Sequence, residues 1–307
     1  MQTRTGGYPQ HRPFLSYFPY LRQGMKNILG IVGSTRKMGN SELTVKMISR
    51  RISEPHSLSI IRLSDLNIKP CLGCYKCIAG KGECVLKDDM EVFLDALARA
   101  DGVILSVPVY FFGPNGTIKM IVDRCCMFYP RFDKFLGKPC VIAILLGIKG
   151  KDGYTSAALG SAAMTMGLDI MGEANFFAAG LGEVLTYEKN YKLAEELGQA
   201  LFSPKRNITQ DGQRCQICGS QSFKFIKDGV ECLVCQNKGQ LISENKQICI
   251  KIKEEGSGSE VMTMKDRLDH LTWVRGKKDD YAQKRAKLKK MSREFSEDGT
   301  WIKGEKA

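Results

Sequence analysis

The stretch Met25-Lys-Asn-Ile-Leu-Gly-Ile-Val-Gly33-Ser34-Thr35-Arg36-Lys37-Met38-Gly39-Asn40-Ser41 decides the fold of this chain. Residues 28–32 form an apolar run typical of a buried strand, and Asn40 or Ser41 can cap the helix that follows. Backbone N–H groups, hydroxyls, Arg36 and the helix dipole converge where a phosphate would bind. The turn is neither a Walker A nor a G-x-G-x-x-G motif, and any strand-to-helix turn needs capping residues. By itself it therefore predicts the local fold more firmly than a ligand.

The same alternation of strand and helix continues to about residue 201. Apolar runs predict four further strands at 58–63, 103–109, 140–146 and 170–179. Amphipathic or small-residue segments lie between and after them, and they predict helices, one of them over 117–127. This order predicts an α/β domain over 25–204 with a doubly wound, parallel five-stranded sheet and ligands at the carboxyl ends of the strands.

A cysteine-rich loop over 71–84 follows the second predicted strand. Three thiols in a C-x2-C-x2-C run and a fourth six residues later can converge on one inorganic core; they are Cys71, Cys74, Cys77 and Cys84. Thiolate ligands indicate an iron-sulfur cluster or zinc, and the tight run favours iron-sulfur because structural zinc usually lies between two separated knuckles. The alternative is a set of reduced cysteines that pack a turn or form a transient disulfide.

A loop of aromatic residues follows the third predicted strand, and it consists of Pro108, Val109, Tyr110, Phe111, Phe112 and Gly113. Three successive aromatic side chains at the end of a strand cannot all be core, and a flat conjugated ring would stack on them. The alternative is a hydrophobic subunit interface. In this architecture both interpretations can hold.

Two C-x2-C knuckles separated by thirteen residues lie in the second part of the chain, and they predict a small metal-binding lobe over 210–252. The hairpin between them brings the two sulfur pairs together, so the ligands are Cys215, Cys218, Cys232 and Cys235. The polar turns around the knuckles favour a zinc ribbon. A rubredoxin-like iron site is the alternative, and it would be a further redox centre.

Taken together, these stretches resemble the flavodoxin-like NAD(P)H-dependent FMN reductase superfamily, and specifically its iron-sulfur flavoprotein branch, over about 25–200. The resemblance also rests on Lys87-Asp88-Asp89-Met90 and on Lys119 with Asp123-Arg124. It implies that the cysteine loop binds a [4Fe-4S] cluster near the flavin, although related reductases carry a similar loop without an established cluster. It also implies that the aromatic loop binds the FMN ring, that the loop 147–154, which begins at Gly147, completes the flavin site, and that the phosphate is held by Ser34, Thr35, Arg36, Gly39, Asn40 and Ser41.

Composition places the chain among soluble globular proteins. It has 307 residues, of which 43% are hydrophobic, and twelve cysteines. The longest apolar run, 141–146, is too short to span a bilayer, and residues 1–24, a non-globular extension, lack the pattern of a signal peptide. We therefore expect cytoplasmic residence and no membrane association, with either Met1 or Met25 as the start.

The formal charge of +13 does not predict a nucleic-acid partner. The excess is spread as +3 over 1–25, +4 over 26–205 and +6 over 206–307. The charged segment 260–307 is expected to be a helical tail, and the acidic residues among its lysines favour a solvated helix.

These features predict an oxidoreductase in which FMN and the cluster pass electrons from NAD(P)H or a ferredoxin-like donor to a protein or quinone acceptor. The chain has three histidines and no Ser-His-Asp or Cys-His arrangement, so no catalytic side chain is predicted. One alternative is a cluster-free NAD(P)H-dependent FMN or quinone reductase. Another is a redox-sensing module that binds through the ribbon and the basic tail. A homo-oligomer is expected.

Overall fold

The computed structural model describes residues 24–80, 82–204, 214–244, 247–252, 264–296 and 298. Most of the expected N-terminal extension and the residues that link the three parts of the chain lie outside the described residues.

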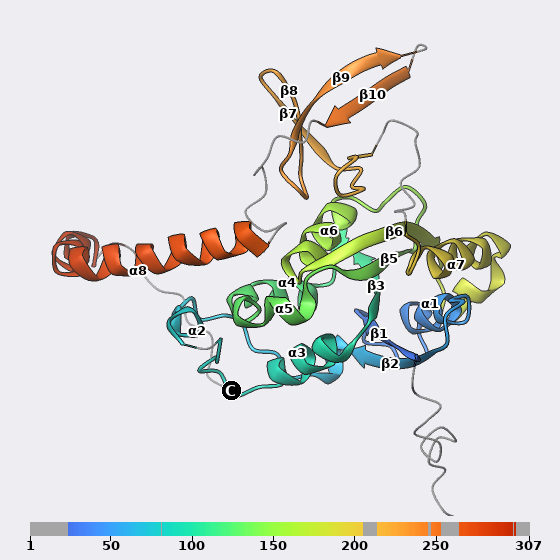
Figure 1. Ribbon diagram of the computed structural model, residues 1–307, viewed down its shortest axis with the longest axis horizontal. Coiled ribbons are helices and arrows are strands. Elements are labelled where there is room, and N and C mark those ends of the chain that lie inside the picture. The colour runs from blue at the N-terminus through green and yellow to red at the C-terminus, as the bar shows by residue number, and fades with distance from the viewer. Residues whose placement is uncertain are drawn as a thin grey trace, which may run out of the picture.

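A parallel sheet forms the centre of the molecule (Figure 1). Its five long strands lie in the order β2-β1-β3-β5-β6, and each pairs in parallel with its neighbours. The predicted flavodoxin-like α/β fold is therefore confirmed, since this order is one of the two common doubly wound orders. The strands are β1 (Lys26–Val32), β2 (His56–Arg62), β3 (Gly102–Tyr110), β5 (Lys138–Leu146) and β6 (Leu168–Phe177), and a two-residue strand, β4 (Gly113–Pro114), pairs with the end of β3.

Helices cover both faces of the sheet and bury two apolar clusters. One face packs against α1 (Asn40–Ser49) and α7 (Glu188–Ala200). The other packs against α3 (Met90–Arg99), α4 (Gly116–Val122), α5 (Phe132–Phe135) and α6 (Thr155–Thr165). The prediction of one helix over 117–127 was too long, because α4 ends at Val122 and 3-10 turns follow at Cys125–Met127 and Tyr129–Arg131. Other 3-10 turns occur at Leu63–Asp65 and Glu183–Thr186.

The predicted metal-binding lobe is a separate antiparallel sheet in the order β10-β9-β8-β7, and Figure 1 shows it above α6. Its strands are β7 (Phe223–Ile226), β8 (Gly229–Cys232), β9 (Lys238–Glu244) and β10 (Gln247–Ile252). Val234 lies so close to α6 that a Cβ on Gly160 would be 3.0 Å from its Cγ2. Met164 of α6 joins the buried cluster of the lobe. The lobe therefore packs directly on the α/β domain.

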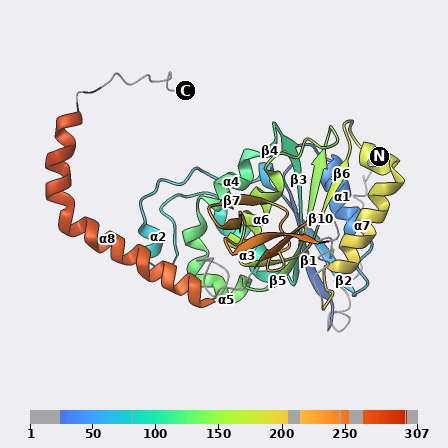
Figure 2. The same cartoon turned by 90° about the horizontal axis from the view of Figure 1, so that it is seen from above.

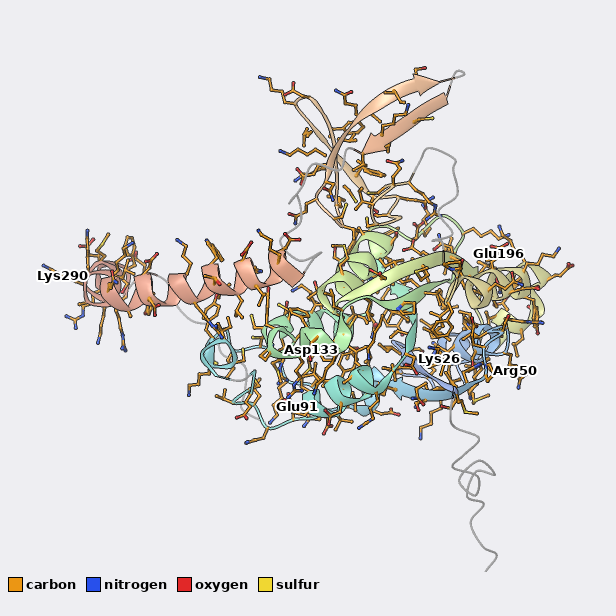
Figure 3. The ribbon with its side chains drawn as sticks, viewed as in Figure 1. Lys26, Arg50, Glu91, Asp133, Glu196 and Lys290 are labelled. Atoms are coloured by element: carbon orange, nitrogen blue, oxygen red, sulfur yellow. The ribbon has the colours of Figure 1, made fainter. Side chains whose placement is uncertain are left out.

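The helical tail is also present, as α8 (Met264–Ser292) and a 3-10 turn at Arg293–Phe295. Figures 1 and 2 show that it runs past α5 and the short helix α2 (Lys76–Ala79). Its first turns contact the domain, since Tyr129 Oη lies 2.6 Å from His270 Nδ1 and Arg275 Nε donates to Ile78 O at 3.3 Å. Beyond Arg275 the described side chains of the tail, including Lys290, are exposed to solvent (Figure 3). Within the described part of the chain, no helix combines the length and apolar character needed to cross a membrane.

Candidate functional site

The turn that was predicted to bind a phosphate lies at the carboxyl end of β1. Ser34 and Gly39 are buried, and Thr35 and Arg36 are exposed. The Ser34 hydroxyl accepts a hydrogen bond from the Arg36 N–H at 3.3 Å. The first intrahelical hydrogen bond of α1 runs from Leu43 N to Gly39 O, so the N–H groups of residues 40–42 have no acceptor inside the helix. The turn therefore offers backbone donors and an exposed cation.

Glu42 stabilises this turn, although it was not among the predicted site residues. Its carboxylate accepts a hydrogen bond from Met38 N at 2.8 Å and forms ion pairs with Lys46 Nζ and Arg62 Nη2, both at 2.6 Å. The hydrogen bond from Lys46, together with those from Met38 and Arg62, lowers the pKa of Glu42 to about 2. Two cations thus pair with the Glu42 carboxylate.

Asn40 and Ser41 begin α1 and have different surroundings. Asn40 Nδ2 donates to Gly180 O at 2.8 Å, and its Oδ1 accepts from Val184 N at 3.3 Å, so this side chain ties the turn to the loop after β6. The Ser41 hydroxyl is buried and has no hydrogen-bond partner among the described residues. Such a group is costly unless a ligand satisfies it, so Ser41 is better suited than the Asn40 side chain to contact a phosphate.

Asn115 joins the loops after β1 and β3. Its Nδ2 donates to Gly33 O at 2.7 Å and to Thr117 Oγ1 at 2.6 Å. Residue 33 must be glycine here, because a Cβ would lie 2.8 Å from Asn115 Oδ1 and 3.1 Å from the Val107 side chain. No sequence motif predicts this role, since the contact forms only when two distant loops meet.

The aromatic loop is a tight hairpin between β3 and β4. Val109 pairs with Pro114 and Tyr110 with Gly113, which leaves Phe111 and Phe112 as a two-residue turn. Both turn residues have positive φ, 48° and 68°, a conformation that such hairpins usually give to asparagine or glycine. Phe111 is 98% exposed, and Tyr110 and Phe112 are about half exposed. Strained backbone and exposed aromatic rings at a strand end are typical of a ligand site.

The loop after β5 packs against this hairpin. Tyr154 N donates to Phe112 O at 2.9 Å, and a Cβ on Gly113 would lie 2.3 Å from Tyr154 Oη. Gly147 begins the loop in an exposed position, opposite the backbone of Ala179. Three predicted flavin loops therefore meet at one edge of the sheet. Their polar turn and aromatic faces fit a ligand with a phosphate and a flat ring.

The cysteine loop encloses a cavity of about 220 Å³. Cys71, Cys74, Cys77 and Cys84 line it as predicted, and Cys126 faces them from the turn after α4. Hydrogen bonding to Cys126 raises the pKa of the Cys77 thiol. Cys126 belongs to this wall because α4 ends at Val122 and the 3-10 turn that follows it borders the cavity. Cys140, by contrast, is fully buried in β5.

A buried ion pair supports the cysteine loop. Arg124 Nη1 bonds to Asp88 Oδ2, and both side chains are 1% exposed. Asp88 also accepts hydrogen bonds from Lys69 N at 2.9 Å and Met90 N at 3.3 Å. This pair ties both ends of the loop to α3 and to the end of α4.

The four cysteines of the lobe form a compact site. Among the described residues, they are the one group of metal-ligating side chains whose ligand atoms all lie within 4.8 Å of one another. The sulfurs are 3.5 Å apart in the pairs Cys215–Cys235 and Cys218–Cys232. A tetrahedral zinc with Zn–S of ~2.3 Å needs sulfurs about 3.8 Å apart, so the arrangement suits one tetrahedral ion.

The two knuckles have the same backbone turn. Gly219 N donates to Cys215 O at 2.8 Å and Gln236 N to Cys232 O at 2.9 Å. Gly219 and Gln236 both have positive φ. The two turns therefore present their sulfurs in the same way.

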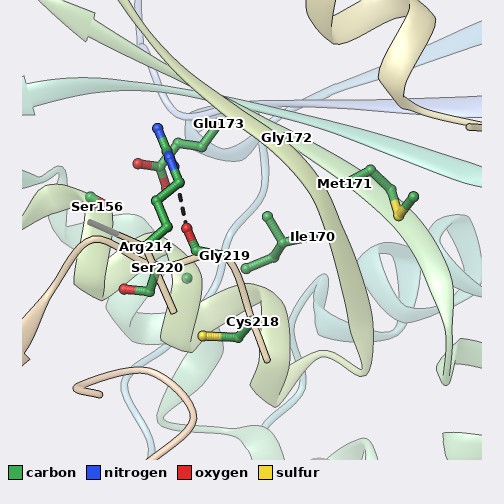
Figure 4. A pocket seen from close by; sticks show the side chains of 10 residues that line it. Ser156, Ile170, Met171, Gly172, Glu173, Arg214, Cys218, Gly219 and Ser220 are labelled. Atoms are coloured by element: carbon green, nitrogen blue, oxygen red, sulfur yellow. Dashed lines mark hydrogen bonds between the residues drawn. The ribbon is translucent and has the colours of Figure 1, made fainter. Parts of the chain in front are cut away.

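A small pocket lies where the lobe meets the edge strand β6 (Figure 4). Arg214 Nη1 donates to Gly219 O at 3.2 Å beside Glu173, whose pKa is raised because the carboxyl is buried. The pocket has a volume of about 20 Å³, which is room for little more than one water. It is therefore part of the contact between the lobe and the α/β domain.

The strand order and the loops at the carboxyl edge define a flavodoxin-like domain. The chain belongs to the NADPH-dependent FMN reductase family, whose sequence model matches residues 26–180. Iron-sulfur flavoproteins of Methanocaldococcus jannaschii and Archaeoglobus fulgidus are 39% and 35% identical over 98 and 101 residues. These matches cover 32% and 33% of this chain, and 50% and 49% of the relatives, so the chain spans about half the length of the curated relatives it matches. They agree with the predicted resemblance to iron-sulfur flavoproteins.

One solved structure resembles almost the whole chain. A flavone reductase superposes with a TM-score of 0.66 and 18% identity, covering 90% of this chain and 100% of its own. At this identity the likeness concerns the fold.

Proposed function

We propose that this protein binds FMN and a [4Fe-4S] cluster and passes electrons from NAD(P)H or a ferredoxin-like carrier to a quinone or a protein acceptor. A flavin exchanges one or two electrons and a cluster exchanges one, so neighbouring centres allow a pair of electrons to be divided. A homo-oligomer is part of the proposal, because the exposed aromatic hairpin suits a subunit contact as well as a ring.

The observation that carries the proposal is the position of α4. This helix starts directly after Asn115, which holds the flavin loops together, and ends before Arg124, which lines the cysteine cavity. Seven residues of helix span about 10 Å. The candidate flavin and cluster sites are therefore joined by one short rigid element.

The chain's own residues bind and orient. Ser34, Thr35, Arg36 and Ser41 would hold the phosphate, and the hairpin with Gly147 and Tyr154 would hold the ring. Tyr110→Ala should weaken FMN binding at any salt concentration. Arg36→Ala should weaken it mainly at low salt, because Arg36 is exposed and screened by ions.

A cluster-free flavin reductase is the second candidate. It is favoured by the exposure of Cys71 and Cys74, because exposed thiols in a loop also suit reduced cysteines without a cluster. In the ribbon we propose zinc, with iron as the alternative.

The deciding experiment is the visible spectrum of anaerobically purified protein, with its iron, sulfide, zinc and extracted flavin. FMN with about four iron and four sulfide supports the proposal. FMN without sulfide supports the reductase, and FAD alone would contradict both.

A further inference from the structure

Arg124 is a buried cation in the wall of the cysteine cavity. It follows α4 and is 2% exposed. Among the described residues of this wall, Asp123 is the one other charged residue. Its side chain is 42% exposed and forms an ion pair with Lys119. The cavity therefore has one buried charge in its wall, and that charge is positive.

The guanidinium of Arg124 has unused donors. It carries five N–H groups. Nη1 bonds to Asp88 and lies 3.5 Å from Lys69 O, and Nη2 contacts the weak acceptor Met127 Sδ at 3.4 Å. Nε is buried and has no partner among the described residues. An unpaired buried donor is costly, which indicates that a ligand in the cavity completes this group.

The geometry points to an anionic ligand. Asp88 is held by the backbone at Lys69 and Met90 and is not part of the cavity wall, so Arg124 lies between this carboxylate and the thiols. Cys84 lines the same cavity as Arg124. The guanidinium therefore borders the cavity together with one predicted cluster ligand.

We propose that Arg124 donates a charge-assisted hydrogen bond to the sulfur of Cys84 and thereby holds the anionic iron-thiolate centre and raises its reduction potential. This inference rests on the proposed function, because it needs a cluster in the cavity. A buried anion needs a partner charge, and hydrogen bonds to the sulfurs of a cluster tune its reduction potential. Arg124 is thus a positioning residue that makes the centre easier to reduce.

The test compares two charge-neutral double variants. Asp88→Asn with Arg124→Met removes the buried pair together, which avoids leaving an unpaired carboxylate. Glu91→Gln with Arg131→Gln removes a nearby pair, 2.6 Å apart, whose residues are not part of the cavity wall. Each protein is assayed for the midpoint potential of the cluster and for the rate of iron loss to a ferrous chelator.

We expect the Asp88/Arg124 variant to have a lower cluster potential and at least tenfold faster iron loss, with FMN retained. The Glu91/Arg131 variant should match the wild type in both. If the Asp88/Arg124 variant loses FMN, the single variant Arg124→Lys tests the inference instead. It keeps the positive charge and lacks Nε, so the midpoint potential of its cluster should be lower than in the wild type. Full iron with an unchanged potential overturns this inference alone. Wild-type protein without iron and sulfide overturns the proposed function and this inference together.

Discussion

Replacing Gly153 by alanine should separate the aromatic hairpin from the loop after β5. Gly153 has a φ of +59°, and an added Cβ would lie 2.2 Å from Phe112 O and 2.7 Å from Phe112 Cα. Both atoms belong to the backbone, so no side-chain rotation relieves the clash. The hydrogen bond from Tyr154 N to Phe112 O, now 2.9 Å, would have to lengthen.

Gly150 provides the matched control for this change. It lies in the same loop with a φ of +69°, and an added Cβ would meet nothing within 4 Å. Both alanine variants bear the cost of a left-handed residue, about 1–2 kcal/mol. Gly153→Ala also bears the overpacking term, about 1–3 kcal/mol. If FMN binding requires the hairpin in place, the Kd for FMN should rise about 5- to 150-fold more in Gly153→Ala than in Gly150→Ala.

Flavin fluorescence titration of the deflavinated proteins measures this difference, and circular dichroism checks that both fold. Equal Kd values for the two variants would refute the argument, because the clash would then have no effect on the flavin site. If Gly153→Ala is less stable but binds FMN normally, the hairpin is not part of the flavin site.

Four further predictions follow from other parts of the structure. Cys77→Ala should abolish the iron-sulfur absorption and leave FMN bound, whereas the buried control Cys140→Ala should keep both; equal spectra would exclude the loop as the cluster site. Cys232→Ser should unfold the lobe, because metal binding supplies much of the folding free energy of so small a unit. Limited proteolysis should then cut within 214–252 while FMN is retained, and an uncut lobe would contradict this prediction. The pKa of Glu42 is lowered from 4.5 to about 2, so its ion pairs stabilise the folded chain above about pH 4.5 and are lost as the pH falls towards 2. Urea unfolding should therefore show the wild type losing about 1–2 kcal/mol more than Glu42→Gln over that range, and parallel pH profiles would be evidence against the pairs. His270→Ala should detach the first turns of α8 and speed proteolysis there, with Lys290→Ala as the control; identical digestion would mean that the contact with Tyr129 does not hold the helix.

The strands of the sheet and the loops at their carboxyl ends were predictable, because each follows from a local sequence pattern. Apolar runs such as 141–146 mark strands that are buried on both faces, and polar or aromatic turns after them mark the carboxyl ends. Asn115 could not be predicted as a site residue, since it acts through a backbone carbonyl of another loop, whereas Tyr154 lies in the predicted flavin loop 147–154. The turn Phe111-Phe112 even opposes its local preference, because both residues adopt a conformation that tight hairpins normally give to glycine or asparagine.

The tail was predicted as a solvated helix, and its outer part is one. Its first turns could not be predicted to dock, because the contacts of His270 with Tyr129 and of Arg275 with Ile78 O join residues about 140 and 200 positions apart. Arg275 bonds to α2, which belongs to the cysteine loop. The tail is therefore attached to the candidate cluster site and not only to the ribbon.

The two cysteine groups differ in a way that bears on the metals they would bind. In the ribbon, matching knuckle turns bring all four sulfurs within 4.8 Å of one another, which is close enough to bind one tetrahedral ion. In the loop, Cys71, Cys74, Cys77 and Cys84 surround a cavity of about 220 Å³ instead of converging. A core of several iron and sulfide atoms separates its thiolate ligands farther than a single ion does, so the open arrangement favours a cluster over zinc in the loop. Zinc analysis tests this directly: about one zinc per chain, lost in Cys232→Ser and retained in Cys77→Ala, agrees with the reasoning, and a second zinc lost in Cys77→Ala contradicts it.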